Sequence, residues 1–186
     1  MSWKLTLVTV LSCLVTLSCS VTNRDDEYRV DLEQGIELTL TPPPEALINR
    51  SLSQLFSVTA QGKRFEFIVQ TEISSKGIVM VALTPDSLPA FEIEFTQGQP
   101  LQVRSYIQQW QQLAPYILAD FQLVYWPVDR LNNNLTGSRM SQQVSPQVRI
   151  LEDVSKKIIV KIEVNSDTIR FQHMNKNYSF SIEELE

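Results

Sequence analysis

The chain has few of the residues that carry catalysis or bind metals. It contains one histidine, two cysteines and five glycines among 186 residues. A serine hydrolase would have to use His173 as its base, and no Gly-x-Ser-x-Gly motif presents a nucleophile. A zinc site draws three or four ligands from His, Cys and carboxylate side chains, so here it would be almost all carboxylate. The scattered glycines also form no phosphate-binding loop. We therefore expect no enzymatic activity, no cofactor and no bound metal.

Two glutamates could imitate the paired carboxylates of a glycosidase, because Glu92 and Glu94 lie two residues apart. They alternate with apolar residues, however, and a strand that buries the apolar side chains turns both carboxylates to solvent. His173 lies in a strand-and-turn sequence and is expected to be exposed or hydrogen-bonded within the fold. Neither feature predicts catalysis.

Both cysteines lie in the first twenty residues, MSWKLTLVTVLSCLVTLSCS. Lys4, an apolar run over 5–17 and the pair Ser18-Cys19 resemble a bacterial lipoprotein signal, which implies cleavage after Ser18 and acylation of Cys19. Palmitate-like chains would then hold the protein on a bilayer. Cys13 with its shorter apolar core, ordinary secretion and a membrane anchor are the alternatives, although a spanning helix needs roughly 20 apolar residues. No aspartate follows Cys19, which implies the periplasmic face of the outer membrane.

Removal of the signal peptide, residues 1–18, would leave a mature chain with no thiol besides the lipidated Cys19. Residues 19–35 are polar and charged and predict a flexible tether. Residues 36–186 are enough for one domain, which we expect to be monomeric. The net charge of −5 gives no electrostatic case for binding nucleic acid.

Alternating apolar residues predict roughly eight to ten strands in two blocks of the chain. Turn residues separate the segments in each block, so a sequential antiparallel meander is the simplest topology. The segments are 36–40, 65–69, 78–83 and 91–95 in the first block and 147–151, 158–164, 169–171 and 178–182 in the second.

The segment between the two blocks predicts helices. Pro115 fits the first turn of one helix, Pro127 begins a second short helix, and Gly137 fits its C-terminal cap. A further short helix is predicted over 45–54, after Pro44. Together these elements predict a mainly β fold with helices (α+β), in which helices pack against the concave face of a curved antiparallel sheet.

Several segments resemble known families. LADFQLVYWP (118–127), QGKRFEFIVQTEI (61–73) and NYSFSIEEL (177–185) resemble an uncharacterised family of small Gram-negative outer-membrane lipoproteins associated with aryl polyene gene clusters. The layout resembles the LolA/LolB lipoprotein-localisation family, which implies a curved antiparallel half-barrel with a helical plug. In that family a leucine in a loop between two strands is implied to touch the membrane. VALTPDSLPAFEIEF (81–95) places Leu88 in the matching loop, which here is longer and more polar, unless Pro89 folds Leu88 back onto Phe91.

Aromatic residues of the helical segment are expected to face apolar residues of the sheet and to line a hydrophobic cavity. The expected lining comprises Phe65, Phe67, Val69, Val79, Val81, Phe91, Ile93, Phe95, Trp110, Tyr116, Phe121, Tyr125 and Trp126. With the resemblance, this predicts an outer-membrane lipoprotein that binds an acyl, polyene or lipoprotein lipid chain for transport or membrane insertion. Its partners would be the membrane, through Cys19, the lipid chain and a periplasmic carrier protein. The alternative is a non-catalytic accessory or interaction lipoprotein of the envelope whose apolar residues form a closed core.

Overall fold

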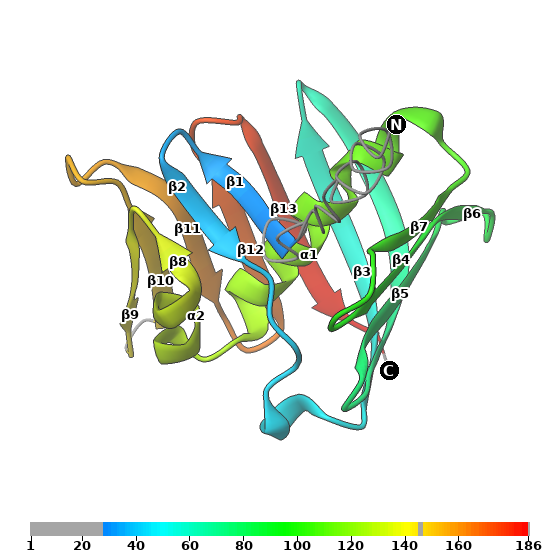
Figure 1. Ribbon diagram of the computed structural model, residues 1–186. Coiled ribbons are helices and arrows are strands. Elements are labelled where there is room, and N and C mark those ends of the chain that lie inside the picture. The colour runs from blue at the N-terminus through cyan, green and yellow to red at the C-terminus, as the bar shows by residue number, and fades with distance from the viewer. Residues whose placement is uncertain (1–27, 145–146, 186) are drawn as a thin grey trace, which may run out of the picture.

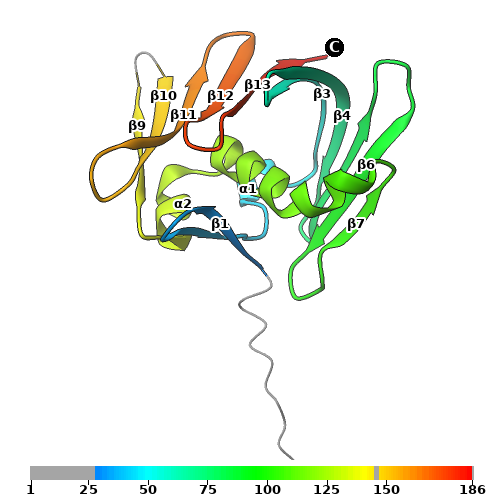
Figure 2. The same cartoon turned by 90° about the horizontal axis from the view of Figure 1, so that it is seen from above.

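The fold is built around one ten-stranded antiparallel sheet. A computed structural model describes residues 28–144 and 147–185. The sheet has the order β7-β6-β5-β4-β3-β13-β12-β11-β10-β9, so β7 and β9 are its free edges and it does not close. Seen from above, it curves around a helix (Figure 2). Its strands are β3 (Arg50–Ala60), β4 (Lys63–Ile73), β5 (Gly77–Leu83), β6 (Pro89–Thr96), β7 (Gln102–Ser105), β9 (Arg139–Gln143), β10 (Gln147–Glu152), β11 (Ile158–Val164), β12 (Thr168–His173) and β13 (Tyr178–Glu184).

The two predicted blocks of strands join at the middle of this sheet. β3 pairs with β13 along seven residue pairs, from Tyr178 opposite Ala60 to Glu184 opposite Gln54. On either side of that junction the strands follow one another in chain order as antiparallel hairpins. The expected meander is therefore confirmed within each block, and the curved sheet with helices on its concave side is confirmed as an α+β fold (Figure 1).

A second, small sheet is formed by β1 (Arg29–Glu33), β2 (Ile36–Thr39) and β8 (Leu135–Thr136). The prediction of a flexible tether over 19–35 is therefore wrong for its last part, where residues 29–33 form a strand. Val30 and Leu32 alternate with charged residues, so β1 buries one face and exposes the charged one, and a polar composition hid that pattern. The rest of the tether, the signal peptide and Cys19 lie outside the described residues.

Two α-helices follow the first block of strands: α1 (Ala114–Tyr125) and α2 (Val128–Asn134). Pro115 lies in the first turn of α1 and Pro127 is the N-cap of α2, as their spacing predicts. α1 lies on the concave side of the sheet, preceded by the 3₁₀ helix η3 (Gln108–Leu113) (Figures 1 and 2). Among the described residues, no helix has the length and apolar character needed to cross a membrane.

Two predicted features differ in the structure. The helix predicted over 45–54 is only the 3₁₀ turn η2 (Glu45–Leu47), because the chain from Arg50 onward is β3 and pairs on both sides. Gly137 does not cap α2, whose C-cap is Leu135; it turns the chain between β8 and β9 with φ +78°. A Cβ on Gly137 would lie 1.8 Å from the carbonyl oxygen of Gly35, so the close approach of two turns requires glycine there.

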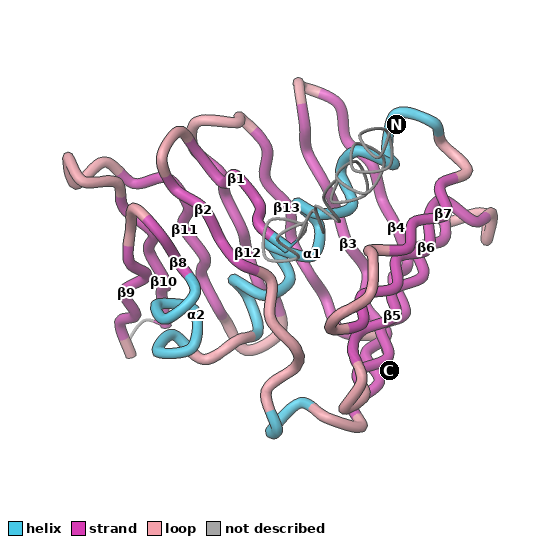
Figure 3. The backbone as a smooth tube through the Cα atoms, in the orientation of Figure 1, coloured by secondary structure: helices cyan, strands magenta, loops and turns pink. Residues whose placement is uncertain are grey.

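Figure 3 shows that strands and turns make up most of the chain. The described residues form thirteen strands, more than expected, because β3, β7, β8 and β9 lack a clear apolar alternation and β1 was hidden by its charged composition. The strands predicted from alternating residues are all present. The hydrophobic core lies between the concave face of the large sheet, α1 and the small sheet.

Candidate functional site

The concave face of the large sheet carries rows of apolar side chains that face α1. In one row, Phe67 lies opposite Phe56 of β3, which lies opposite Ile182 of β13. In the next row, Phe180 lies opposite Phe171, and the two rings stack with centroids 4.5 Å apart. Aromatic rings therefore cover much of this face.

Most of the predicted cavity residues come together in this layer. Trp110 of η3 packs over Phe67 and Phe91, with ring centroids 4.8 and 6.3 Å away, and Phe65 lies 5.7 Å from the same ring. Phe121 of α1 contacts Tyr125 and Trp126, with centroids 4.6 and 5.7 Å apart. Val69, Ile93 and Phe95 are buried on the same face of the sheet.

The prediction of cavity-lining residues is wrong for Val79 and Val81, and Tyr116 lies elsewhere. Val79 and Val81 lie on the convex face of β5, since Met80 pairs with Ile93 and shares its concave face. The unbroken apolar run 78–83 gave no signal of which alternate residues point inward. The Tyr116 ring lies under the ammonium of Lys176, 4.1 Å from its centroid, beside the β12–β13 turn.

Four large apolar side chains are exposed near Trp110, and we call them the apolar rim. Leu88 is 62% exposed, Tyr106 56%, Leu113 45% and Phe65 36%. They lie at one end of the concave face: Leu88 precedes β6, the Tyr106 amide donates to the carbonyl oxygen of Ala90, and Leu113 ends η3. Exposed apolar side chains gathered in this way are typical of a surface that meets another apolar surface.

Leu88 projects from the hairpin loop between β5 and β6. The loop is closed at its base, where the amide of Thr84 donates to the carbonyl oxygen of Leu88 at 2.8 Å and the amide of Leu88 donates to Thr84 Oγ1 at 3.1 Å. Its exposed side chain is not folded back onto Phe91. The alternative that Pro89 buries Leu88 is therefore wrong.

A buried carboxyl joins α1 to the sheet. The hydroxyl of Tyr178 on β13 donates to Asp120 Oδ2 at 2.6 Å. Burial raises the pKa of Asp120 to about 7, although this hydrogen bond and the charge of Lys176 act to lower it. Lys176 donates from Nζ to the carbonyl oxygen of Asp31, and burial lowers its pKa. Sequence reasoning missed this contact, because 58 residues separate its partners.

A second polar contact lies at the end of α1. Gln54 Nε2 on β3 donates to the hydroxyl of Tyr125 at 2.6 Å, and burial raises the pKa of that hydroxyl. The other amide atom, Gln54 Oε1, and the hydroxyl of Thr71 are buried without a hydrogen-bond partner among the described residues. Both side chains are on the concave face, where sequence analysis expected apolar residues alone.

The C-terminal end of α1 is fixed by polar contacts. Arg149 Nη1 of β10 donates to the carbonyl oxygens of Leu123, Val124 and Trp126 at 2.7 to 3.0 Å, and burial lowers its pKa. The indole of Trp126 donates to Thr41 Oγ1 at 3.0 Å. These bonds satisfy helix carbonyls that have no partner within the helix.

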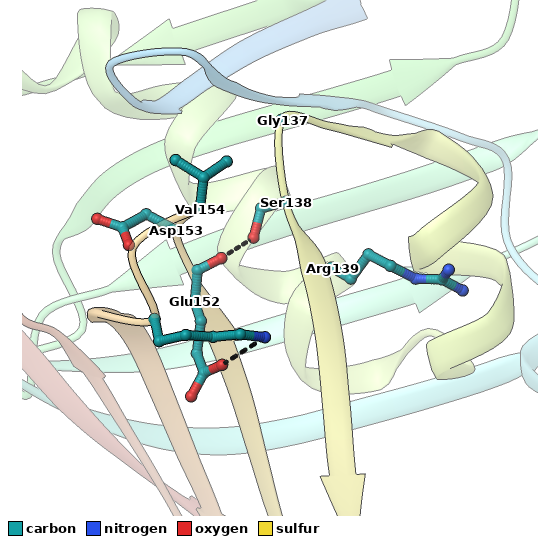
Figure 4. A pocket seen from close by; sticks show the side chains of 7 residues that line it. Gly137, Ser138, Arg139, Glu152, Asp153 and Val154 are labelled. Atoms are coloured by element: carbon teal, nitrogen blue, oxygen red, sulfur yellow. Dashed lines mark hydrogen bonds and ion pairs between the residues drawn. The ribbon is translucent and has the colours of Figure 1, made fainter.

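Two surface hollows lie away from the predicted cavity residues. One, of about 280 Å³, lies between the β8–β9 and β10–β11 turns and is lined mostly by residues with polar or charged side chains (Figure 4). There the hydroxyl of Ser138 donates to the carbonyl oxygen of Glu152, whose carboxylate lies 3.8 Å from Lys156 Nζ. The other, of about 200 Å³, lies on the convex face between Arg64 and Arg170.

The side chains considered for catalysis form ion pairs or hydrogen bonds within the fold. Glu92 is on the convex face of β6 and forms a 2.8 Å ion pair with Arg104. His173 is buried, with Nε2 donating to the carbonyl oxygen of Leu32 at 3.1 Å and Nδ1 accepting from the amide of Lys176. The hydrogen-bonded histidine and the outward glutamates agree with the sequence predictions. No three His, Cys, Asp or Glu side chains among 28–144 and 147–185 are placed to hold a metal ion.

A family model described as "Protein of unknown function (DUF3261)" matches residues 51–186. The chain belongs to the DUF3261 family. This match spans nearly the whole of the large sheet and α1, while β1 and β2 lie before it. No curated protein matches the chain. The expectation that the chain belongs to an uncharacterised family is confirmed. The outer-membrane location, the association with aryl polyene gene clusters and the resemblance to LolB stay predictions.

Proposed function

We propose that this DUF3261 protein is an outer-membrane lipoprotein, anchored through Cys19, that binds an apolar lipid chain on the concave face of its sheet. The chain would be an acyl, polyene or lipoprotein lipid chain, taken up for transport or for insertion into the membrane. The protein would act by binding alone, without a cofactor.

The observation that carries this proposal is the aromatic layer of the concave face and its continuation into the apolar rim. Phe67, Phe91 and Trp110 pack against one another, and Phe65 continues the same layer to the surface. The sheet is open, and apolar side chains lie both on its concave face and in the apolar rim. Such a surface favours a ligand with a long apolar chain.

The rim also offers a route for the chain. Trp110 belongs to the short 3₁₀ helix η3 and is partly exposed, so its ring can turn aside with less loss of packing than the fully buried rings. A lipid chain entering there would replace Trp110 against Phe67 and Phe91. A bilayer, or a carrier protein with a bound lipid, would meet Leu88 and Tyr106 at the same end.

One observation favours the second candidate function, an accessory or interaction lipoprotein with a closed core. Leu118, Leu123 and Trp126 have no exposed surface, and Ile93 on the facing sheet has none either. Protein side chains therefore fill the middle of the space between the concave face and α1 in this conformation. A ligand must displace some of them, whereas an accessory protein needs no such change.

Native mass spectrometry of the full-length protein, extracted from membranes under mild conditions, distinguishes the two candidates. We expect one non-covalently bound lipid per chain. Trp110→Glu places a charge on the proposed route and should abolish that adduct, while Val144→Glu, at a side chain that is 88% exposed, should retain it. Circular dichroism would verify that both variants fold. Absence of a bound lipid from the wild-type protein would favour the closed core.

A further inference from the structure

The concave face contains a polar pair within its apolar layer. Gln54 on β3 is 4% exposed and Thr71 on β4 is 1% exposed. Thr71 lies opposite Leu52, and Gln54 lies opposite Val69, so the two polar side chains are diagonal neighbours on one face of the sheet. The cross-strand partners of Thr71 are Leu52 and Met80, and those of Gln54 are Val69 and Glu184.

Each member of the pair has an unused hydrogen-bonding atom. Gln54 uses Nε2 for the Tyr125 hydroxyl, but neither Gln54 Oε1 nor Thr71 Oγ1 has a partner within the described part of the chain. Buried polar atoms are usually paired, because leaving one unpaired costs free energy. The side-chain amide could also be turned over, and one of its two ends would then still be unpaired.

We propose that Gln54 and Thr71 bind the amide linkage of an N-acylated ligand whose chain lies on the concave face. This inference rests on the proposed function and narrows its ligand class. An amide has both an N–H donor and a carbonyl acceptor, so it can pair with Gln54 in either orientation of the side-chain amide. Thr71 can donate to the ligand carbonyl. With Gln54 Nε2 bound to Tyr125, an ester has no donor for Gln54 Oε1 and would leave that buried atom unpaired.

Tyr125 would orient the side-chain amide of Gln54 toward the ligand. Its hydroxyl is only 2.6 Å from Gln54 Nε2, and it belongs to the last residue of α1, where the side chain is partly exposed. The ligand would pair with the free Oε1 and leave this contact in place. Removing the hydroxyl should therefore let the Gln54 amide turn over and reduce the preference for an amide ligand, whereas removing the polar groups of Gln54 or Thr71 should weaken binding of the amide.

The test uses the full-length chain in lipid nanodiscs and two photo-crosslinking probes. Both carry the same palmitoyl chain with a terminal diazirine, one as its N-methyl amide and one as its methyl ester. Intact-mass spectrometry measures the crosslinked fraction. We expect the amide to crosslink about tenfold more than the ester, because only the amide can donate a hydrogen bond to Gln54 Oε1.

Isosteric variants identify the groups responsible. Gln54→Met should reduce the amide-to-ester ratio to about one without lowering ester crosslinking, and Tyr125→Phe should reduce the same ratio. Thr71→Val should lower crosslinking of both probes, because both have a carbonyl. Thr59→Val is the matched control, because Thr59 is exposed on the convex face of β3. Equal crosslinking of the two probes to the wild-type protein would overturn this inference alone. No crosslinking of either probe would overturn the proposed function together with it.

Discussion

Asp120 lies on the buried side of α1, where its carboxyl group accepts a hydrogen bond from Tyr178. Its pKa is about 7 in the folded protein and 3.8 as the ordinary reference value. The folded state therefore keeps a proton that the unfolded chain releases between these two values. Stability contributed by this proton is full below about pH 4 and is lost as the pH rises to about 7.

Asp120→Asn should remove this pH dependence. The shift from 3.8 to about 7 corresponds to about 4 kcal/mol at 1.4 kcal/mol per pKa unit, so we expect the variant to be more stable than the wild type at pH 8 by about 2–4 kcal/mol. Urea unfolding followed by tryptophan fluorescence from pH 4 to pH 8 measures this. Tyr178→Phe removes a hydrogen bond that lowers the pKa of Asp120. The pH range over which this stability is lost should therefore extend to higher pH. An unchanged pH slope in Asp120→Asn would contradict the assignment.

Leu88→Glu should weaken association with liposomes while changing the melting temperature by less than about 2 °C, because an exposed side chain contributes little packing. Flotation of the full-length Cys19→Ser protein, in which the proposed lipid anchor is removed, measures association. Val154→Glu is the control, since Val154 is 92% exposed in the β10–β11 turn. A large fall in melting temperature would show that Leu88 supports the fold, and unchanged flotation would remove it from membrane contact.

Single residues differed in how far the sequence could predict them. Phe67 and Phe91 were placed correctly, because each belongs to a strand in which apolar residues mostly alternate with polar ones. Val79 was not, since an apolar run has no period from which to choose a face. Gln54 and Thr71 carry no sequence signal at all, because their importance comes from the register of two strands.

At the scale of elements, the helix starts were predictable because proline acts locally. Pro115 and Pro127 restrict their own backbone and lack an N–H, so each indicates a first turn without reference to tertiary structure. β3 was not predictable. Ile48, Leu52 and Leu55 have helical spacing, yet Arg50–Ala60 is a strand because β4 and β13 pair with its two sides. The partner β13 is too distant in sequence to leave a local signal.

The turns of the small sheet give a prediction at this scale. Gly137→Ala should lower the free energy of unfolding by about 1–3 kcal/mol more than Gly98→Ala. Both glycines have φ +78°, so both variants incur the same backbone strain, but only at Gly137 would the new Cβ meet the Gly35 carbonyl. Urea unfolding of the two variants compares them directly. Equal losses would mean that the contact between the two turns contributes nothing to stability.

At the scale of the whole molecule, the large sheet depends on strands from both ends of the domain. β3 and β13 meet at its middle, so the two blocks cannot form one curved face until the last strand is in place. The sequence predicted the blocks and their order, since each is a local meander. It did not predict the pairing that joins them, because any two strand edges could have met.

The proposed membrane attachment concerns the entire chain and is tested through its cysteines. Cys19→Ser should move the protein from the membrane fraction to the soluble fraction and remove the mass of the acyl groups. Cys13→Ser should leave both unchanged. Fractionation and intact-mass measurements report the outcome. Loss of lipidation in Cys13→Ser with retention in Cys19→Ser would reverse the assignment of the modified residue.

The position of Tyr28 limits how the domain can be oriented on a bilayer. Its hydroxyl donates to the carbonyl oxygen of Gln99 at 2.7 Å and its ring packs on Phe95, at the end of β6 opposite Leu88. β6 is about 25 Å long, and the stretch from Cys19 to Tyr28 can extend to about 30 Å at most. With Cys19 in the membrane, an upright domain would direct its apolar rim away from its own bilayer, toward an approaching carrier. The domain could bring Leu88 to the lipid surface by lying on its side or by extending nearly all of this stretch, so loading and delivery would correspond to different orientations of the same sheet.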